Sequence, residues 1–380
     1  MITKRTIAGK IGLMGLMGLM GLMGCSGEVT AVPEAGEPLQ AIALNVYTSQ
    51  PMATRADSSL LAESAIPGGK SIGVYAYYHD NSSWSDDATP NFMFNQQATN
   101  EGKNNPFNYS PIKYWPNEEE DKLSFIAYYP YCDGSEEQIA ALGLTPNFAN
   151  TDTGLPTFDF VVKDTVKEQV DFLVSDLMPN QTKGRITDYV RFLFRHATAK
   201  IEFRVVVDEA VRKDLAYFTL KSIAITNINN EGTITPTYNA PVPPETEGTT
   251  SFSWTATGEH TYYCKTTEAY LLMPQTLCDD AQLVVNYDLA FKSEGTTYIY
   301  DKSGNPIATE EYVFNNRQST VQLNTLKKGS TDDALDTWEA NHHYVYVIRI
   351  GAKRIDYHGE VVDWGETTVW DDINVDQPDI

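Results

Sequence analysis

Apolar and polar residues alternate with a period of two along much of this chain, which is typical of β-strands with one buried face. Residues 199–207 (AKIEFRVVV) give the clearest case: Ile201 and Phe203 share one face, whereas Lys200 and Glu202 share the other. That charged face must meet water or a partner. The same pattern predicts further strands over residues 41–48, 71–79, 123–130, 283–291 and 344–350.

Helical patterns are scarce. Residues 135–143 (SEEQIAALG) predict one short helix, because glutamates stand near its start and a glycine stands at its end. Turn signals separate the strand patterns, for example at residues 229–232 (NNEG) and 301–306 (DKSGNP). Many short strands, proline-rich turns and few helices predict an all-β protein built from antiparallel β-sandwiches.

The length of 380 residues is typical of about two domains, and a hydrophobic content of 42% is ample for their cores. The polar, turn-rich segment at 179–188 (PNQTKGRITD) precedes a new series of strands that begins at Tyr189. We therefore expect a domain boundary near residues 180–190.

The formal net charge is −23, and loss of Lys4, Arg5 and Lys10 with a leader would make it more negative. A surface this acidic repels phosphate groups, which argues against nucleic acid or anionic lipid headgroups as partners. The charge suits a soluble surface that faces outward and is kept apart from its neighbours by self-repulsion.

The N-terminus has the composition of a lipoprotein signal peptide. A basic start (MITKRTIAGK) precedes an apolar repeat that ends at Gly24 and is too short for a permanent membrane helix. Residues 22–25 (LMGC) resemble the bacterial lipobox, which implies cleavage before Cys25 and a diacylglyceryl lipid, with palmitate as an acyl chain, on the Cys25 thiol. The alternative is an ordinary secretory signal followed by an incidental cysteine.

A spacer and one strand follow the lipobox. Residues 26–40 are polar, hold two prolines and predict a flexible spacer. The strand predicted at 41–48 has Ile42, Leu44 and Val46 on one face, and Arg55 follows it amid small and acidic residues. If Cys25 carries lipid, an odd number of cysteines remains, which cannot form a complete disulfide framework. We expect buried thiols, with a Cys264–Cys278 bridge as the alternative, at the remaining positions Cys132, Cys264 and Cys278.

The sequence offers no convincing catalytic set. It lacks a G-x-S-x-G motif, and Gly69-Lys70-Ser71 resembles the end of a phosphate loop but has Ser64 where the first glycine should be. The adjacent His342 and His343 would point to opposite faces of a strand, so we expect solvated edge residues rather than ligands of one metal ion. We therefore predict that the chain is not an enzyme and needs no cofactor or metal.

Acidic clusters and aromatic residues also receive the plainer interpretation. Residues 118–121 (EEED) and the aspartates Asp371, Asp372 and Asp376 lack the regular oxygen spacing of a calcium loop, so we expect solvated charges. Tyrosine and tryptophan could build a glycan platform. However, several of them occupy alternating positions where core aromatics are expected.

Several phrases, read together and in order, carry a resemblance to a known family. The most recognisable piece contains Phe194, His196, Ala197, Ala199 and Lys200. The whole series is YWP (114–116), LSFIAYYP (123–130), DFLVSD (171–176), VRFLFRHATAKIEFRV (190–205), YLLMPQTL (270–277) and YVYVIRI…VVDWGE (344–366). In order and spacing it resembles the fimbrillin family, the subunits of the type V adhesive pili of Bacteroidales, over nearly all of the mature chain.

The resemblance implies two transthyretin-like Greek-key β-sandwich domains in tandem after a lipoprotein signal peptide. It also implies proteolysis after an N-terminal arginine, for which the bond between Arg55 and Ala56 is our candidate. That cut would free the first strand, and a strand from another fimbrial subunit would fill the groove by donor-strand exchange. The expected parts are a signal peptide (1–24), a lipidated spacer with a removable first strand (25–55), an N-terminal β-sandwich (56–187) and a C-terminal β-sandwich (188–380).

The leading hypothesis is thus a cell-adhesion subunit of a fimbrium, lipid-anchored at the outer membrane as a precursor, with a host protein or glycan as a possible ligand. The last residues (TTVWDDINVDQPDI) form no convincing alternating donor strand, which favours a tip or accessory subunit over a stalk subunit. The alternative is a surface lipoprotein that binds glycans through exposed tryptophans such as Trp84 or Trp254, without forming pili.

Overall fold

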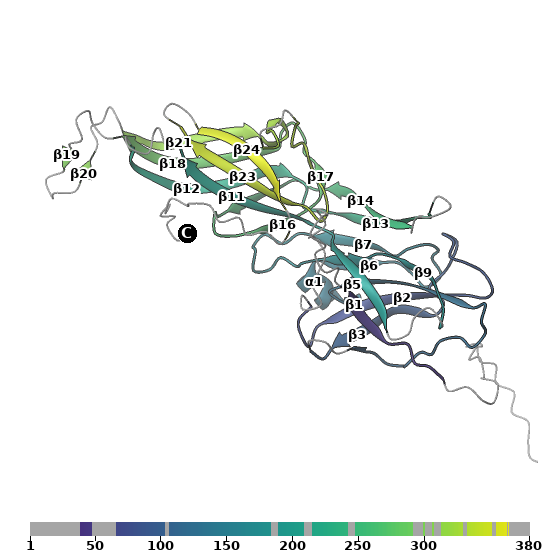
Figure 1. Cartoon of the computed structure of the whole chain (residues 1–380). Coiled ribbons are helices and arrows are strands. Elements are labelled where there is room, and N and C mark those ends of the chain that lie inside the picture. The colour runs from purple at the N-terminus through teal and green to yellow at the C-terminus, as the bar shows by residue number, and fades with distance from the viewer. Residues whose placement is uncertain are drawn as a thin grey trace, which may run out of the picture. The chain divides into compact units, whose positions relative to one another are not determined.

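The computed structural model describes residues 39–47, 66–102, 106–183, 189–208, 215–241, 248–291, 299–300, 306–307, 313–329, 333–351, 355–362 and 364. Nearly all regular structure in this part of the chain is β-strand (Figure 1), so the all-β prediction is confirmed. A short helix, α1 (Glu136–Leu142), lies where it was predicted. The side chain of Ser135 accepts a hydrogen bond from the Gln138 N–H, and Gly143 ends the helix in a left-handed conformation.

The largest sheet closes on itself. Its strand order is β2-β3-β4-β1-β10-β8-β5-β9, and β2 also pairs with β5, so the strands from β2 round to β5 form a ring. We call it the ring sheet. Its strands are β1 (Leu44–Tyr47), β2 (Ser71–His79), β3 (Met93–Asn100), β4 (Phe107–Asn108), β5 (Lys122–Tyr129), β8 (Leu173–Ser175), β9 (Met178–Gln181) and β10 (Val190–His196).

Two four-stranded sheets follow, which we name the β11 sheet and the β12 sheet. The β11 sheet has the order β16 (Tyr270–Leu272), β11 (Ala199–Val207), β23 (His343–Ile350) and β24 (Ile355–Val362). The β12 sheet has the order β15 (His260–Cys264), β12 (Leu215–Ile228), β18 (Gln282–Phe291) and β21 (Val313–Gln322). Figure 1 shows the two sheets as layers, and their buried apolar side chains belong to one cluster.

A fourth sheet draws on both sides of residue 187. This β14 sheet has the order β14 (Thr249–Thr257), β13 (Glu231–Asn239), β7 (Thr157–Val161) and β6 (Leu144–Asn147). Its strand pairing therefore joins segments assigned to the two expected sandwiches, and the transthyretin-like division of the chain stays a prediction. The remaining short elements are β17 (Gln275–Thr276), β22 (Thr337–Trp338), β19 (Ile299–Tyr300), β20 (Pro306–Ile307) and the 3₁₀ helix Leu323–Thr325.

The alternating pattern located the long strands well. The strands predicted at 71–79 and 199–207 match β2 and β11 to the residue, and the other predicted strands match β1, β5, β18 and β23 within a few residues. In β11 the buried and partly exposed positions alternate without a break along all nine residues. Apolar side chains on one face of each strand thus determine where the strand runs and which way it faces.

The buried apolar residues form two clusters. The smaller cluster fills the ring sheet and contains Leu44, Phe107, Phe125 and Phe192. The larger cluster lies between the β11 and β12 sheets and continues to the outer face of the ring, where Tyr75 and Tyr128 join it. The ring sheet therefore has apolar side chains on both faces, one set inside the ring and one set against the rest of the molecule.

Candidate functional site

Strand β1 lies between β4 and β10 in the ring sheet. It runs parallel to β10 through four residue pairs, from Leu44 opposite Val190 to Tyr47 opposite Leu193. On its other side it is antiparallel to β4 at one pair, in which Leu44 lies opposite Phe107. In the described chain, β1 is the only strand that joins β4 to β10, so the ring would open at this place without it.

Backbone hydrogen bonds extend this pairing toward the N-terminus. The Ile42 N–H donates to the Lys113 carbonyl at 2.9 Å, and the Trp115 N–H donates to the Gln40 carbonyl at 3.0 Å. On the β10 side, the Val190 N–H donates to the Ala43 carbonyl at 2.8 Å. The segment from Gln40 to Tyr47 is thus held on two sides by main-chain contacts that any extended peptide could make.

The side chains of this segment alternate as the sequence predicts. Ile42, Leu44 and Val46 are almost completely buried inside the ring, at 2%, 0% and 2% exposure, whereas Ala43 and Asn45 between them are only partly buried. Burying three aliphatic side chains of this size is worth about 1.5–3 kcal/mol each. Loss of the segment would leave a groove lined by the apolar side chains of the smaller cluster, and it would leave unpaired backbone groups in β10.

Sequence reasoning missed the residues that receive this segment. The Tyr109 hydroxyl donates to the Ile42 carbonyl at 2.7 Å, and Trp115 packs edge-on against Phe125 with ring centroids 6.0 Å apart. In the sequence, Trp115 stands out only as part of the YWP phrase at 114–116. Pairing between 40–42 and 113–115 joins segments far apart in the sequence, and neither segment carries a local signal for the other.

The predicted modification sites Cys25, Arg55 and Ala56 lie outside the described residues. The described residues nearest to Arg55 in sequence are Tyr47 before it and Ile66 after it. β1 ends at Tyr47, and the described chain resumes at Ile66, which is 3% exposed and whose carbonyl accepts a hydrogen bond from Asn100 Nδ2 at 2.9 Å. Arg55 therefore falls in the connection between β1 and the next segment that packs in the ring, and the lipidation and cleavage stay predictions.

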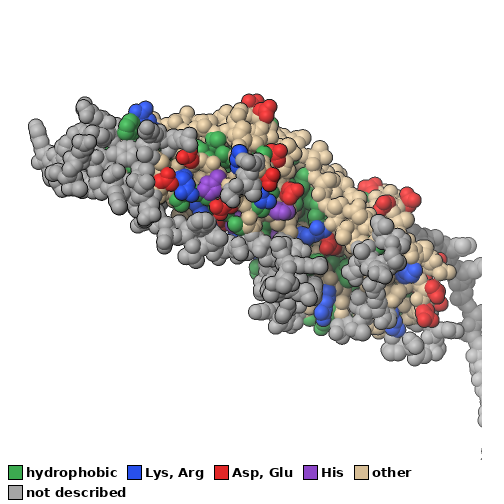
Figure 2. All heavy atoms as spheres, turned by 45° about the horizontal axis from the view of Figure 1, so that its top comes forward, with side chains coloured by type: hydrophobic (Ala, Val, Ile, Leu, Met, Phe, Trp, Pro, Cys, Tyr) green, Lys and Arg blue, Asp and Glu red, His purple; other side chains and the backbone are tan. Residues whose placement is uncertain are grey.

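The charged face of β11 is held by mutual contacts. Figure 2 shows basic, acidic and histidine side chains lying together on one face of the molecule. Glu202 lies 3.2 Å from Lys200 Nζ, 3.9 Å from Arg204 and 3.3 Å from His343 Nε2. The hydrogen bond with His343, followed by the positive charges of His343 and Lys200, lowers the pKa of Glu202 to about 2 against the opposing effect of burial.

The prediction that His342 and His343 are solvated edge residues is wrong for His343. This side chain is completely buried at the start of β23, and β23 has partner strands on both sides. His342 is half-exposed and lies 3.5 Å from Glu339. The alternation of strand faces separates the two rings as expected, but sequence alone does not show that β24 covers β23.

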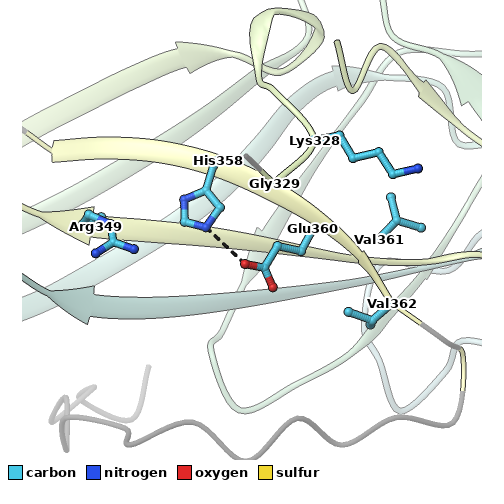
Figure 3. A pocket seen from close by; sticks show the side chains of 7 residues that line it. All are labelled: Lys328, Gly329, Arg349, His358, Glu360, Val361 and Val362. Carbon is cyan, nitrogen blue, oxygen red and sulfur yellow. Dashed lines mark hydrogen bonds and ion pairs between the residues drawn. The ribbon is translucent and has the colours of Figure 1, made fainter. Parts of the chain in front are cut away.

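An open pocket of about 710 Å³ lies over β24, with Lys328, Arg349, His358 and Glu360 in its wall. Figure 3 shows His358 directed toward Glu360, and their Nε2 and Oε1 atoms are 3.3 Å apart. Arg349 forms its own ion pair with Asp208 at 3.0 Å. Within the wall His358 and Glu360 thus pair with each other and Arg349 pairs with Asp208 outside it, and the described wall offers no nucleophile beside a base.

The cysteines of the described chain are all unbridged, so the alternative of a Cys264–Cys278 disulfide is wrong. Cys132 and Cys264 are buried as expected, and burial raises the pKa of both thiols. Cys278 is exposed, contrary to the prediction.

No three histidine, cysteine or acidic side chains of the described residues are grouped as metal ligands would be. In the acidic loop at 118–121, Asp121 is buried rather than solvated, and its Oδ2 accepts a hydrogen bond from the Tyr78 hydroxyl at 2.7 Å. The aspartates Asp371, Asp372 and Asp376 lie outside the described residues. None of the described helices is long and apolar enough to span a membrane.

The two tryptophans suggested as exposed glycan contacts are both partly buried, so that expectation is wrong. Trp84 packs edge-on against Tyr77 with ring centroids 4.8 Å apart. The indole N–H of Trp254 donates to the Ala197 carbonyl at 2.8 Å. Both rings pack against the larger core cluster, as the core interpretation of the aromatic residues predicts.

Comparison with known proteins places these features in a family. The sequence profile of a family described as fimbrillin-like matches residues 54–364. The fimbrium subunit Fim1C of Phocaeicola vulgatus is 23% identical over 89% of this chain and 92% of its own length. A fimbrial protein crystal structure from Bacteroides vulgatus is 20% identical, covers 86% of this chain and 99% of its own, and superposes with a TM-score of 0.54. A putative cell adhesion protein from Bacteroides uniformis is 17% identical over 86% of this chain and 98% of its own, with a TM-score of 0.43. The profile match spans well over half of the sequence, and the chain therefore belongs to the fimbrillin-like family.

Proposed function

We propose that this protein is a structural subunit of an adhesive fimbrium and that it joins its neighbours by exchange of strand β1. The observation that carries the proposal is the place of β1 in the ring sheet. It is the single link between β4 and β10 in the described chain, and its apolar face is completely buried. A fimbrillin-like protein is a structural component rather than an enzyme, which agrees with the absence of a catalytic motif in the sequence.

The assembly steps follow from what β1 contributes. A cut after Arg55 separates residues 25–55, which include β1, from the body that begins at Ala56. Loss of β1 uncovers the Leu44 pocket inside the ring and leaves the edge of β10 unpaired. An extended segment of another subunit restores both the main-chain hydrogen bonds and the apolar contacts, which is the general logic of strand addition.

The lipid on Cys25 gives the precursor its place in this scheme. It tethers the chain to the outer membrane until the cut at Arg55 removes both the anchor and β1. In a subunit that is not cut, the same lipid is a lasting anchor. The tip or accessory position stays a prediction from the sequence, because residues 365–380 lie outside the described part of the chain.

The alternative of a glycan-binding lipoprotein loses its main support. The two tryptophans proposed as exposed contacts pack against the core, and the Trp254 N–H is already hydrogen-bonded to the protein. A fimbrial subunit with a host protein or glycan ligand elsewhere on its surface is compatible with the fold.

The test uses the purified lipid-free precursor, residues 26–380, and an arginine-specific protease. We expect one cut before Ala56, release of residues 26–55 and formation of oligomers, all of which are lost in Arg55→Ala. The control is Arg317→Ala, an exposed arginine on β21 away from the ring sheet, which should behave as the wild type. N-terminal sequencing and light scattering measure the outcomes. Cleaved protein that releases the fragment but remains monomeric with every fimbrial subunit supplied would overturn strand exchange.

A further inference from the structure

We propose that the free edge of β14 is a second strand-docking site, which receives an extended segment of a neighbouring subunit. The site is separate from the β1 position, and it needs no cleavage to become available. The inference rests on the proposed function, since the occupant is a segment of another fimbrial subunit.

Strand β14 is a long edge without the usual protection. It has nine residues, TTSFSWTAT, with no charged residue and no proline. It pairs with β13 in nine consecutive pairs, from Thr249 opposite Asn239 to Thr257 opposite Glu231, without a register shift. On its other side no described strand pairs with it. A long, regular, uncharged edge of this kind is a template for pairing with another chain.

The strands at the other ends of the described sheets are blunted in recognisable ways. The edge of β24 is covered by residues 327–329, because Gly329 donates to the Gly359 carbonyl at 2.7 Å and Gly359 donates to the Lys327 carbonyl at 3.1 Å. The edge of β21 carries Arg317 and a left-handed Asn316 beside a register shift. The remaining edge strands are short, with a proline at position 146 of β6 and at position 179 of β9, and a register shift opposite β15.

A trough of about 940 Å³ runs beside β14 and gives an added strand room. One wall comes from Thr249 to Phe252 and Trp254 of β14, and the opposite wall comes from β17, β22 and the residues that follow β22. Leu193, Phe252 and Trp254 supply apolar surface, and the carboxylates of the lining already pair within the protein, Asp176 with Arg195 and Glu339 with His342. An extended segment with apolar residues at every second position fits this lining.

The first residues of the edge are already fixed in an extended conformation. The Arg195 guanidinium donates to Asp176 and to the Thr250 carbonyl, and it lies 4.6 Å from the centre of the Phe252 ring. The Leu177 N–H donates to the Thr250 hydroxyl at 2.9 Å. Because the strand is held in place before an occupant arrives, binding costs less conformational entropy.

The same contacts argue against a sugar in this trough. A carbohydrate platform needs an open aromatic face, but Arg195 covers the ring of Phe252. Trp254 packs against Phe160 and Phe172, with ring centroids 6.4 and 6.5 Å apart, and its N–H is bound to Ala197. The main-chain groups of β14 are thus the recognition elements that the trough offers, and they select an extended peptide.

Hydrogen exchange measured by mass spectrometry tests the site in the full-length protein and in assembled fimbriae. In an antiparallel strand, alternate residues direct their backbone groups to opposite sides, so about half of the β14 amides face the free edge. We expect these amides to exchange quickly in the monomer and at least ~10-fold more slowly in fibres, as protected strand amides do. Unchanged exchange over residues 249–257 in fibres would overturn the proposal. Slower exchange of these amides in monomer mixed with soluble mucin glycans would overturn it in favour of a sugar site.

A matched pair of lysine substitutions tests the edge itself. Ser253→Lys places a charge on the edge strand, whereas Thr235→Lys places the same charge on the same face of β13, directly opposite Ser253. Both positions are exposed. We expect Ser253→Lys to reduce fibre formation about 10-fold while Thr235→Lys has little effect, because lysine blocks pairing at an edge. Equal effects would overturn the proposal. Failure of the proposed function is distinguishable, since it appears as cleaved wild-type protein that releases residues 26–55 and remains monomeric.

Discussion

Two parallel strand pairs lie on either side of the turn between β10 and β11, and they differ in how firmly they are held. β1 runs beside β10 through four residue pairs, and β23 runs beside β11 through eight. β23 also pairs with β24 through eight residues, whereas β1 meets β4 at a single pair. One strand is therefore fixed between two long neighbours, and the other is held by a short contact on each side.

The side-chain contacts of β23 are also more specific than those of β1. In β23, the Trp338 indole N–H donates to the Tyr346 hydroxyl at 2.7 Å, and the Tyr346 ring stacks on Phe203 with centroids 5.9 Å apart. In β1, the contacts come from three aliphatic side chains inside a smaller cluster. A strand built this way can be exchanged for another aliphatic strand, because its place in the ring depends on apolar shape and backbone pairing rather than on particular polar contacts.

The largest effect is expected for Ile348→Ala in β23. Ile348 is completely buried between the β11 and β12 sheets, so its truncation leaves a cavity that the two packed sheets cannot close. We expect the free energy of unfolding to fall by about 4 kcal/mol. The control is Arg349→Ala, whose side chain is exposed and should change stability by about 0.5 kcal/mol or less. Urea denaturation measures both; equal losses would contradict a firmly packed β23.

A smaller and more local effect is expected for Leu44→Ala in β1. Leu44 is also completely buried, but it belongs to a four-residue strand in the smaller cluster. We expect a loss of about 2–3 kcal/mol, with faster hydrogen exchange in β10 and unchanged exchange in β11. Ala41→Ser, at an exposed position of the same segment, is the control. Equal acceleration in β10 and β11 would show that the two pairs unfold together and would remove the contrast between them.

The sequence predicts which residues face inward much better than which strands are neighbours. Alternation located β2 and β11 to the residue and placed Ile42, Leu44 and Val46 on the buried face. It could not show that β23 lies parallel to β11. The two strands are separated by more than one hundred residues, and the alternation within one strand does not specify its partner strand.

The predictions for His343 and Trp254 are wrong because other parts of the fold cover these side chains, which the local sequence pattern predicts to be exposed. His343 lies on the outward face of β23, yet β11 and β24 flank it and Glu202 lies beside it, so it is buried. Trp254 lies on an edge strand, yet its ring turns toward the core. In both cases burial depends on strand order in the sheet, which no local period specifies.

The smallest effect concerns the polar side of the β11–β23 pair and depends on pH. The pKa of Glu202 is lowered from 4.5 to about 2 in the folded protein, chiefly by its hydrogen bond with His343. Its contribution is therefore complete above pH 4.5 and is lost as the pH falls toward 2. Because a quarter of the Glu202 side chain is exposed, we expect about 2 kcal/mol rather than the full value of the shift.

Glu202→Gln isolates this contribution. The amide cannot carry the charge that pairs with His343, Lys200 and Arg204, so the variant should be about 2 kcal/mol less stable than the wild type at pH 6 and equal to it near pH 2. Glu231→Gln, at an exposed position of β13, is the control for removal of an acidic group. Urea denaturation from pH 6 to pH 2 measures the difference. A difference in the free energy of unfolding between wild type and Glu202→Gln that stays constant over this range would mean that packing, and not charge, stabilises the outer side of β23. The two parallel pairs would then be alike in depending on apolar packing.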